Sequence, residues 1–369
     1  MKLWQKTVLL LLALAVAVAG GFLAGQHESA SRIQAERDLN ILLNRSELEG
    51  LGEIDGPIYV TGHKSPDPDT VGSAIACAAL LRQLGYDARP VVLGELNNET
   101  KFILESAGLE APERLEDASG CNMILVDHSE YTQSAEGLKD ARIISIIDHH
   151  GDGAVTTGNQ IIYDARPLGA TATIMWIRYR NYGLEPDRQS ALVMMGAILS
   201  DTNNLQSNTT TSADRAAIKA LARLAGISDV DAFYQSVFRA SLSYEGMTDE
   251  QVFLSNYKEY ESGGTKYGIG CVNAYDEADA KDLAERMRRV IPSAAPEMDM
   301  AFAQISAFHD DVDFSYIVPS GDAAAEVLEA AFGDRAVFDG TSYVFKPGIS
   351  RKQVLVPAIT EVLEAHPTE

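Results

Sequence analysis

Cysteine is scarce in this sequence of 369 residues, which holds only Cys77, Cys121 and Cys271. Their count is odd and no pair has the spacing of metal ligands, so neither a disulfide framework nor a thiolate zinc site is expected. Cys77 lies in a run of small apolar residues. We therefore interpret the three cysteines as free, buried thiols.

Basic residues are also few. There are 30 Lys and Arg against 53 Asp and Glu, which gives a formal net charge of -23. Such an acidic surface repels nucleic acid and anionic lipid, so a large polyanionic partner is disfavoured. A small anionic substrate remains possible, because a site can be locally positive. The length favours two domains, since a domain typically has roughly 100–200 residues.

The long uncharged run of the chain is at its N-terminus. Val8 to Gly25 follows Lys2 and Lys6 and holds 18 residues without charge. The run predicts a signal peptide or a membrane anchor over 1–25, and in both cases export of the remainder, with the N-terminal segment able to contact the membrane. Residues 26–50 are polar and predict a linker or a short helix.

Strands and helices alternate from residue 51 to about 245. Apolar runs at 58–60, 90–93, 123–126 and 143–147 are typical of strands buried on both faces of a parallel sheet. Helices are expected at 70–84, 170–182 and 187–199, and a further pair within 212–240. A second, smaller mixed α/β domain is predicted over 250–369. It has a strand at 267–272, a hairpin of 300–308 and 314–318, and helices at 277–290, 323–332 and 357–365.

Carboxylate and imidazole side chains follow several of these strands. Since the carboxyl ends of parallel strands line one edge of an open sheet, we expect these groups to meet in one crevice. Four of the seven histidines belong to this set. The set comprises His63, Asp67, Asp69, Asp127, His128, Asp148, His149 and His150, with Asp201 at the end of a helix.

The ligand types indicate which metal is expected. Several carboxylates with imidazole and no thiolate suit manganese or cobalt, with magnesium weaker. Too many carboxylates converge for one ion, so two ions roughly 3.5–4 Å apart, sharing a carboxylate and activating a hydroxide between them, are expected. Farther along the chain, Arg351 and Lys352 form a candidate phosphate-binding pair, with Lys258 as a third cation. From spacing alone, an ordinary solvated basic pair is favoured.

These motifs together resemble those of the DHH phosphoesterase superfamily. The resemblance rests on His63-Lys-Ser-Pro-Asp67-Pro-Asp69, Asp127-His128, Asp148-His149-His150, Gly169-Ala-Thr-Ala-Thr173 and Ser200-Asp201-Thr202. The terminal Ser350-Arg351-Lys352-Gln353-Val354 is similar to the second DHH-associated domain of family II, manganese-dependent inorganic pyrophosphatases. The similarity covers roughly residues 55–365.

The resemblance implies a parallel-sheet DHH domain, a smaller DHH-associated domain and an active site in the cleft between them. It implies that His63 and Asp67 bind one metal, that Asp69, His149 and Asp201 bind the other, and that Asp127 bridges both. His150, Lys258, Arg351 and Lys352 would contact substrate phosphates, with Asp127, His150 and Lys258 as the catalytic set. Asp148 and His128 would orient ligands. A homodimer formed through the first domain is also implied.

The function expected from this resemblance is hydrolysis of pyrophosphate to two phosphates with two Mn²⁺. The N-terminal run adds the expectation that this occurs outside the cytoplasmic membrane, which departs from the resemblance because the family is usually cytoplasmic. Co²⁺ or Mg²⁺ could replace Mn²⁺, and a further Mg²⁺ could accompany the substrate. Two departures, Ser65 and Ser129 where the family often has Asn, concern the surroundings of the ligands. An exopolyphosphatase, a non-catalytic extracellular phosphate- or metal-binding protein and a membrane-anchored scaffold are the alternatives.

Overall fold

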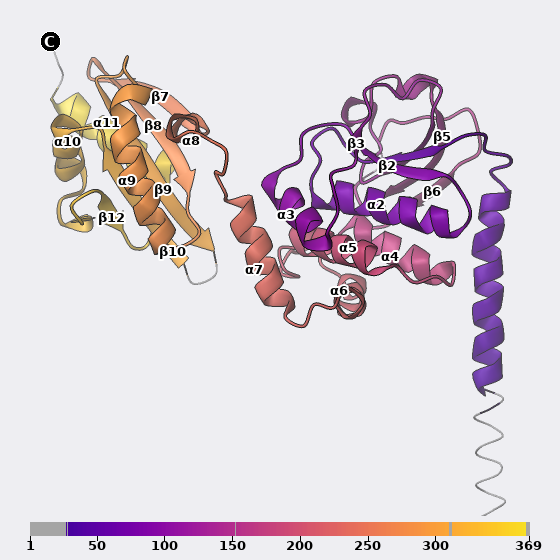
Figure 1. The fold of residues 1–369 in the computed structure, drawn as a ribbon. Coiled ribbons are helices and arrows are strands. Elements are labelled where there is room, and N and C mark those ends of the chain that lie inside the picture. The colour runs from indigo at the N-terminus through magenta and orange to yellow at the C-terminus, as the bar shows by residue number, and fades with distance from the viewer. Residues whose placement is uncertain (1–26, 28, 152, 310–311, 367–369) are drawn as a thin grey trace, which may run out of the picture. The chain divides into compact units, whose positions relative to one another are not determined.

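The computed structural model describes residues 27, 29–151, 153–309 and 312–366. The chain forms two compact units, one up to Ala240 and one from Ser241, and each unit is a sheet covered by helices (Figure 1).

The first unit contains a sheet of six strands in the order β3-β2-β1-β4-β5-β6. Every neighbouring pair is parallel, which confirms the predicted parallel sheet. The strands are β1 (Ile58–Thr61), β2 (Ala88–Val92), β3 (Glu113–Arg114), β4 (Asn122–Val126), β5 (Arg142–Asp148) and β6 (Ile162–Ala165). The chain adds strands in one direction from β1 to β3 and in the opposite direction from β4 to β6. The neighbouring strands β1 and β4 are therefore the point at which the strand order reverses.

Helices of the first unit form two layers on one face of this sheet (Figure 1). Helix α2 packs on β1 and β2, and α5 packs on the far side of α2. Gly72 allows this close approach, because a Cβ there would stand 2.9 Å from the carbonyl oxygen of Val193. The helices are α2 (Pro68–Gln83), α3 (Asn98–Ala107), α4 (Thr171–Asn181), α5 (Arg188–Asp201), α6 (Ser212–Ala225) and α7 (Val230–Ser241).

Both faces of the sheet are buried, which explains its continuous apolar strands. In β4, Ile124 and Val126 join the core beneath the helices. Met123 and Leu125 point to the opposite face, into a second cluster with Leu138. Alternate residues of one strand therefore enter two separate cores.

The second unit has a mixed sheet of six strands in the order β11-β12-β10-β9-β8-β7, in which only the pair β8–β9 is parallel. Helix α9 covers one face, and α10 and α11 cover the other. The elements are α8 (Asp249–Leu254), β7 (Tyr257–Ser262), β8 (Thr265–Asn273), α9 (Glu277–Ala294), β9 (Met300–His309), β10 (Val312–Pro319), α10 (Asp322–Phe332), β11 (Val337–Phe338), β12 (Tyr343–Phe345) and α11 (Val356–Ala365). The mixed second sheet is thus confirmed.

Some elements were absent from the sequence-based expectation. Helix α3 and strands β3, β6 and β7 were not predicted, because they are short or carry mostly polar side chains. The segment read as a linker or short helix forms a helix over 29–49, in which Leu48 is buried against the first unit. The predicted leader at 1–25 lies outside the described residues. Among those that are described, no helix has both the length and the apolar character needed to cross a bilayer.

Candidate metal centre

The polar residues predicted to share a crevice follow the carboxyl ends of three neighbouring strands. His63 follows β1, Asp127 follows β4 directly, and His149 follows β5. The reversal of strand order between β1 and β4 opens this edge, which is where open α/β sheets bind ligands. Asp127 adopts a φ of 61°, a left-handed conformation that is costly for a residue with a side chain.

The start of α2 contributes two carboxylates. Asp67 caps the helix by accepting a hydrogen bond from the backbone N–H of Thr70 at 2.9 Å. Asp69 lies in the first turn and is fully buried. A helix N-terminus favours negative charge, so this placement suits both residues.

Besides the trio of Asp127, His149 and His150, two further groups of potential metal ligands share Asp127. In the first, Nε2 of His63 lies 3.2 Å from Oδ2 of Asp67 and 3.5 Å from Oδ2 of Asp127. In the second, Nε2 of His149 lies 3.4 Å from Oδ1 of Asp127, 3.4 Å from Oδ2 of Asp201 and 3.9 Å from Oδ2 of Asp69. The two oxygens of Asp127 thus face different groups. One carboxylate is shared between both.

Neighbouring charges strongly change how the two histidines titrate. Burial acts to lower the pKa of His63, but hydrogen bonding to Asp127 and Asp67 outweighs it and raises the pKa to about 10. Burial also acts against a charge on His149, yet interaction with Asp127 raises its pKa to about 9. The same contacts hold the pKa of Asp127 below its usual range, although burial alone would raise it.

In the second group, the pKa values of the two remaining carboxylates, Asp69 and Asp201, are raised, in contrast to that of Asp127. Burial, followed by the charges of Asp127 and Asp67, raises the pKa of Asp201 to about 7. Burial and the neighbouring carboxylates raise the pKa of Asp69 well above its ordinary value. The crowding of carboxylates therefore disfavours their simultaneous ionisation, and a divalent cation can offset the same repulsion.

The donor set fits such an ion. Nε2 of His149 is buried and forms no hydrogen bond with any described residue, although three carboxylate oxygens surround it. Ligand atoms about 2.0–2.2 Å from one divalent ion stand roughly 3 Å apart, close to the separations observed. Two such groups sharing Asp127 can hold two ions of a type that prefers oxygen and imidazole.

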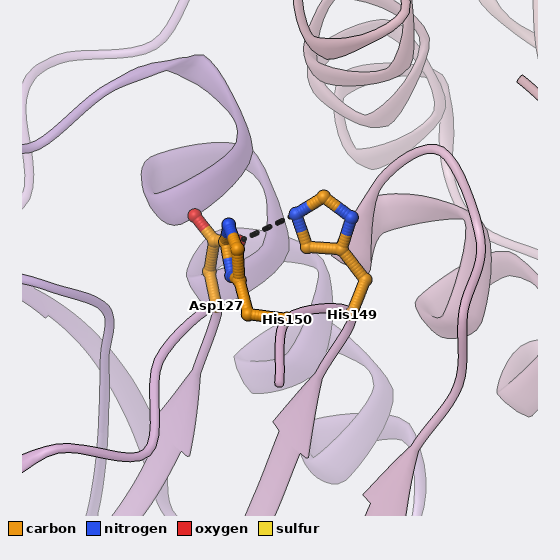
Figure 2. Close-up of side chains that lie close together, drawn as sticks. All are labelled: Asp127, His149 and His150. Carbon is orange, nitrogen blue, oxygen red and sulfur yellow. Dashed lines mark ion pairs between the residues drawn. The ribbon is translucent and has the colours of Figure 1, made fainter. Parts of the chain in front are cut away.

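Not every predicted residue faces the ions. Nδ1 of His150 lies 3.0 Å from Oδ1 of Asp148 and 3.7 Å from Oδ1 of Asp127, and the ring is half exposed. Figure 2 shows His149 and His150 beside Asp127 above the strand ends. His128 is buried, with Nδ1 at 2.9 Å from the carbonyl oxygen of Val126. His128 thus contacts the backbone next to Asp127, not the cluster itself.

Several residues that contact the candidate ligands were not among the predicted site residues. The hydroxyl of Thr70 donates to Oδ2 of Asp127 at 2.8 Å, and that of Thr171 donates to Oδ1 at 3.2 Å. Backbone N–H groups of Thr171 and Ala172 donate to Asp69. The Gly-Ala-Thr-Ala-Thr stretch was one of the motifs on which the family resemblance rested. Its repeated threonine hydroxyls were a sequence signal from which hydrogen bonds to the candidate ligands could have been predicted.

The predicted basic residues come together in the second unit. A cavity of about 640 Å³ is lined by Arg351 and Lys352 together with Cys271. Burial raises the pKa of the Cys271 thiol, while the nearby charges of Arg351 and Lys258 act to lower it. Arg351 is held by hydrogen bonds of 2.7 and 2.9 Å to the backbone and side-chain oxygens of Asn256. This unit therefore presents a concentrated positive site in an acidic chain.

The fold and the centre define a protein of the DHH type. Residues 57–198 match the DHH family, N-terminal domain, and residues 235–362 match the DHHA2 domain. Together these two matches span most of both units.

Similar proteins indicate which group of DHH proteins this chain resembles. A manganese-dependent inorganic pyrophosphatase of Methanothrix thermoacetophila is 35% identical over 305 residues, covering 81% of this chain and 96% of the relative. A probable manganese-dependent inorganic pyrophosphatase of Clostridium acetobutylicum is 34% identical over 315 residues, covering 83% and 98%. A solved structure from Methanococcus jannaschii, described as a candidate family II inorganic pyrophosphatase, is 33% identical, with a TM-score of 0.50 and coverage of 83% and 99%. The chain therefore belongs to the family of manganese-dependent inorganic pyrophosphatases.

Proposed function

We propose that this chain hydrolyses inorganic pyrophosphate to two phosphates with two bound divalent ions, and that manganese is the preferred ion. The observation that carries the proposal is the pair of ligand groups sharing Asp127. The names of the relatives supply the substrate and the metal. Cobalt or magnesium are the alternatives that the ligand types allow, and a further magnesium would accompany the substrate.

His63 and Asp67 would hold one ion, and Asp127 would contribute to both sites. Asp69, His149 and Asp201 would hold the other ion. Bound ions of this kind lower the pKa of a water molecule and offset charge on phosphoryl oxygens. The hydroxyls of Thr70 and Thr171 hold the shared carboxylate of Asp127 in place.

His150 is suited to handle a proton of the substrate. The carboxylate of Asp148 accepts from both the backbone N–H and Nδ1 of His150, each at 3.0 Å. A carboxylate can only accept, so Nδ1 carries a proton and the opposite nitrogen, Nε2, is left for the substrate. Hydrogen bonding to Asp148 also raises the pKa of His150. A protonated Nε2 can then donate to a phosphate oxygen.

Lys258, Arg351 and Lys352 would neutralise the phosphates from the second unit. Arg351 offers a planar guanidinium whose orientation is fixed by Asn256, and Lys352 is an exposed point charge. Preorganised cations of this kind stabilise charge that develops during phosphoryl transfer.

A substrate panel tests the proposal and separates pyrophosphatase from exopolyphosphatase activity. With Mn²⁺ present, we expect phosphate release from pyrophosphate to exceed that from tripolyphosphate and long-chain polyphosphate by at least about tenfold in kcat/KM, which is about 1.4 kcal/mol of discrimination. A preference for long chains would identify an exopolyphosphatase. No release from any of the three would favour a non-catalytic binding protein.

We further propose that the chain is exported and forms a homodimer through its first unit. The uncharged N-terminal run supports export, and the family resemblance supports the dimer. Cell fractionation followed by native mass spectrometry tests both. We expect a dimer outside the cytoplasm, either without the leader or retained in the membrane fraction. A full-length monomer in the cytosolic fraction would contradict the export and the dimer.

A further inference from the structure

One turn of the first unit contacts three of the four ligands in the second group. This turn, Leu168–Thr173, comprises the three residues before α4 and the first three residues of that helix. Its Leu168 carbonyl oxygen lies 3.0 Å from Nδ1 of His149. The N–H groups of Thr171 and Ala172 donate to Asp69 at 2.6 and 2.8 Å. The hydroxyl of Thr171 reaches Asp127 as well.

These contacts set the orientation and charge of the ligands. A carbonyl oxygen accepts the Nδ1 proton of His149, so Nε2 is the nitrogen left to bind an ion among the carboxylates. The two N–H groups at the start of α4 favour the ionised form of Asp69. The position of the Leu168–Thr173 turn therefore determines the geometry of the second ligand group.

Asp214, in the first turn of α6, forms hydrogen bonds with the Leu168–Thr173 turn. The backbone N–H of Gly169 donates to both of its carboxylate oxygens at 3.1 Å, and the hydroxyl of Thr173 donates to Oδ1 at 2.5 Å. The Asp214 side chain is fully buried. Its other partner is Thr211, which donates its N–H and its hydroxyl to Oδ2 at 2.6 Å each. One carboxylate thus joins the start of α6 to the turn.

Gly169 makes this approach possible. A Cβ at this position would stand 2.8 Å from Oδ2 of Asp214 and 2.6 Å from Cγ2 of Thr202. Thr202 directly follows Asp201, the fourth ligand of the second group. Gly169 is therefore packed closely against both Asp214 and the residue that follows Asp201.

Among the described residues, the first ligand group is bonded to this turn only through the shared Asp127. In the part of the chain that the structure describes, no hydrogen bond joins the Leu168–Thr173 turn or Asp214 to His63 or Asp67. Asp67 is instead held by its own helix, through the N–H of Thr70. The Leu168–Thr173 turn therefore forms more hydrogen bonds with the second ligand group than with the first.

We propose that Asp214 is a positioning residue for one metal site, made of Asp69, Asp127, His149 and Asp201, and not for the site of His63 and Asp67. Asp214 does not contact an ion or the substrate. It acts through the Leu168–Thr173 turn. This inference rests on the proposed two-metal function.

Manganese binding to the metal-stripped full-length chain tests it, with free Mn²⁺ followed by electron paramagnetic resonance. We expect Asp214→Asn to weaken one class of site by at least about tenfold, within the 10–100-fold typical of residues that orient metal ligands. The other class should shift by less than about threefold. Asp201→Asn and His63→Gln serve as references for loss of each site, and the class that Asp214→Asn weakens should be the one that Asp201→Asn loses.

Thr173 provides a second variant that leaves the bonds between Asp214 and Thr211 in place. Thr173→Val removes the hydroxyl with little change in shape and should weaken the same class of site. Thr173→Ser keeps the hydroxyl and should bind like the native chain. This pair keeps the test decisive if Asp214→Asn does not fold.

Three outcomes would overturn the proposal: equal weakening of both classes, an isotherm like that of His63→Gln, or native binding by Thr173→Val. A native chain that binds no Mn²⁺ would instead refute the proposed function, and the role of Asp214 with it. The two failures are therefore distinguishable.

Discussion

Asp127→Asn is expected to abolish pyrophosphate hydrolysis. The two oxygens of Asp127 face different ligand groups, at 3.5 Å from His63 and 3.4 Å from His149. An amide offers one oxygen and a pair of N–H donors, so one group would lose a ligand and face a donor instead. Residues that only orient metal ligands already cost about 10–100-fold when changed, so the loss here should exceed about 100-fold in kcat. Phosphate release under saturating Mn²⁺ measures it.

Asp164→Asn is the matched control for this substitution. Asp164 is a largely buried carboxylate of the same unit, paired with Arg166 and Arg178 outside the cluster. We expect this variant to lose some stability while keeping most of its kcat. If Asp127→Asn retained turnover similar to that of Asp164→Asn, the shared carboxylate would not be essential.

Lys352→Ala should lower kcat/KM for pyrophosphate by about 10–100-fold, since a hydrogen bond to a charged group contributes about 1.5–3 kcal/mol. Lys352 is exposed, and it and Arg351 are the basic residues among those that line the cavity of the second unit. Manganese affinity should stay unchanged, because every proposed ligand is in the first unit. Steady-state kinetics together with a manganese titration separate the two effects.

Lys346→Ala gives the comparison. Lys346 is also exposed in the second unit, but its ammonium pairs with Glu277. We expect its kcat/KM to stay within about twofold of the native value, because exposed ion pairs contribute little. Equal losses in both lysine variants would mean that the net charge of the unit, not the position of Lys352, controls the rate.

The candidate ligands Asp127 and His149 were predictable because they follow the ends of apolar strands. Asp127 follows Met-Ile-Leu-Val, and His149 follows Ile-Ser-Ile-Ile-Asp. A parallel sheet aligns such ends whatever the loops between them do. The fold class followed from the same runs, since strands buried on both faces need no alternation.

The supporting contacts were not predictable in the same way. Asp214 and Gly169 lie 45 positions apart, and the sequence around Asp214 shows only a helix start with Thr211. Its second role depends on how α6 packs near α4, which no local pattern encodes. Strand β7 was missed because its burial follows neither an apolar run nor a strict alternation, although it carries Lys258.

The basic site of the second unit also depends on contacts that the sequence alone does not predict. Lys258 and Arg351 are far apart in sequence, and spacing alone had favoured a solvated pair for Arg351 and Lys352. The register of β7 on β8 sets Lys258 opposite Ile269, whose carbonyl oxygen accepts from Arg351 at 3.3 Å. Strand pairing, which a single sequence does not reveal, brings these cations together.

Phosphate release from pyrophosphate by the metal-stripped chain, measured before and after addition of Mn²⁺, tests the central claim most directly. The shared carboxylate and its two groups of ligands predict no turnover without metal and recovery of activity when Mn²⁺ is restored. Turnover that persists after complete removal of metal would contradict a two-metal hydrolase built around Asp127.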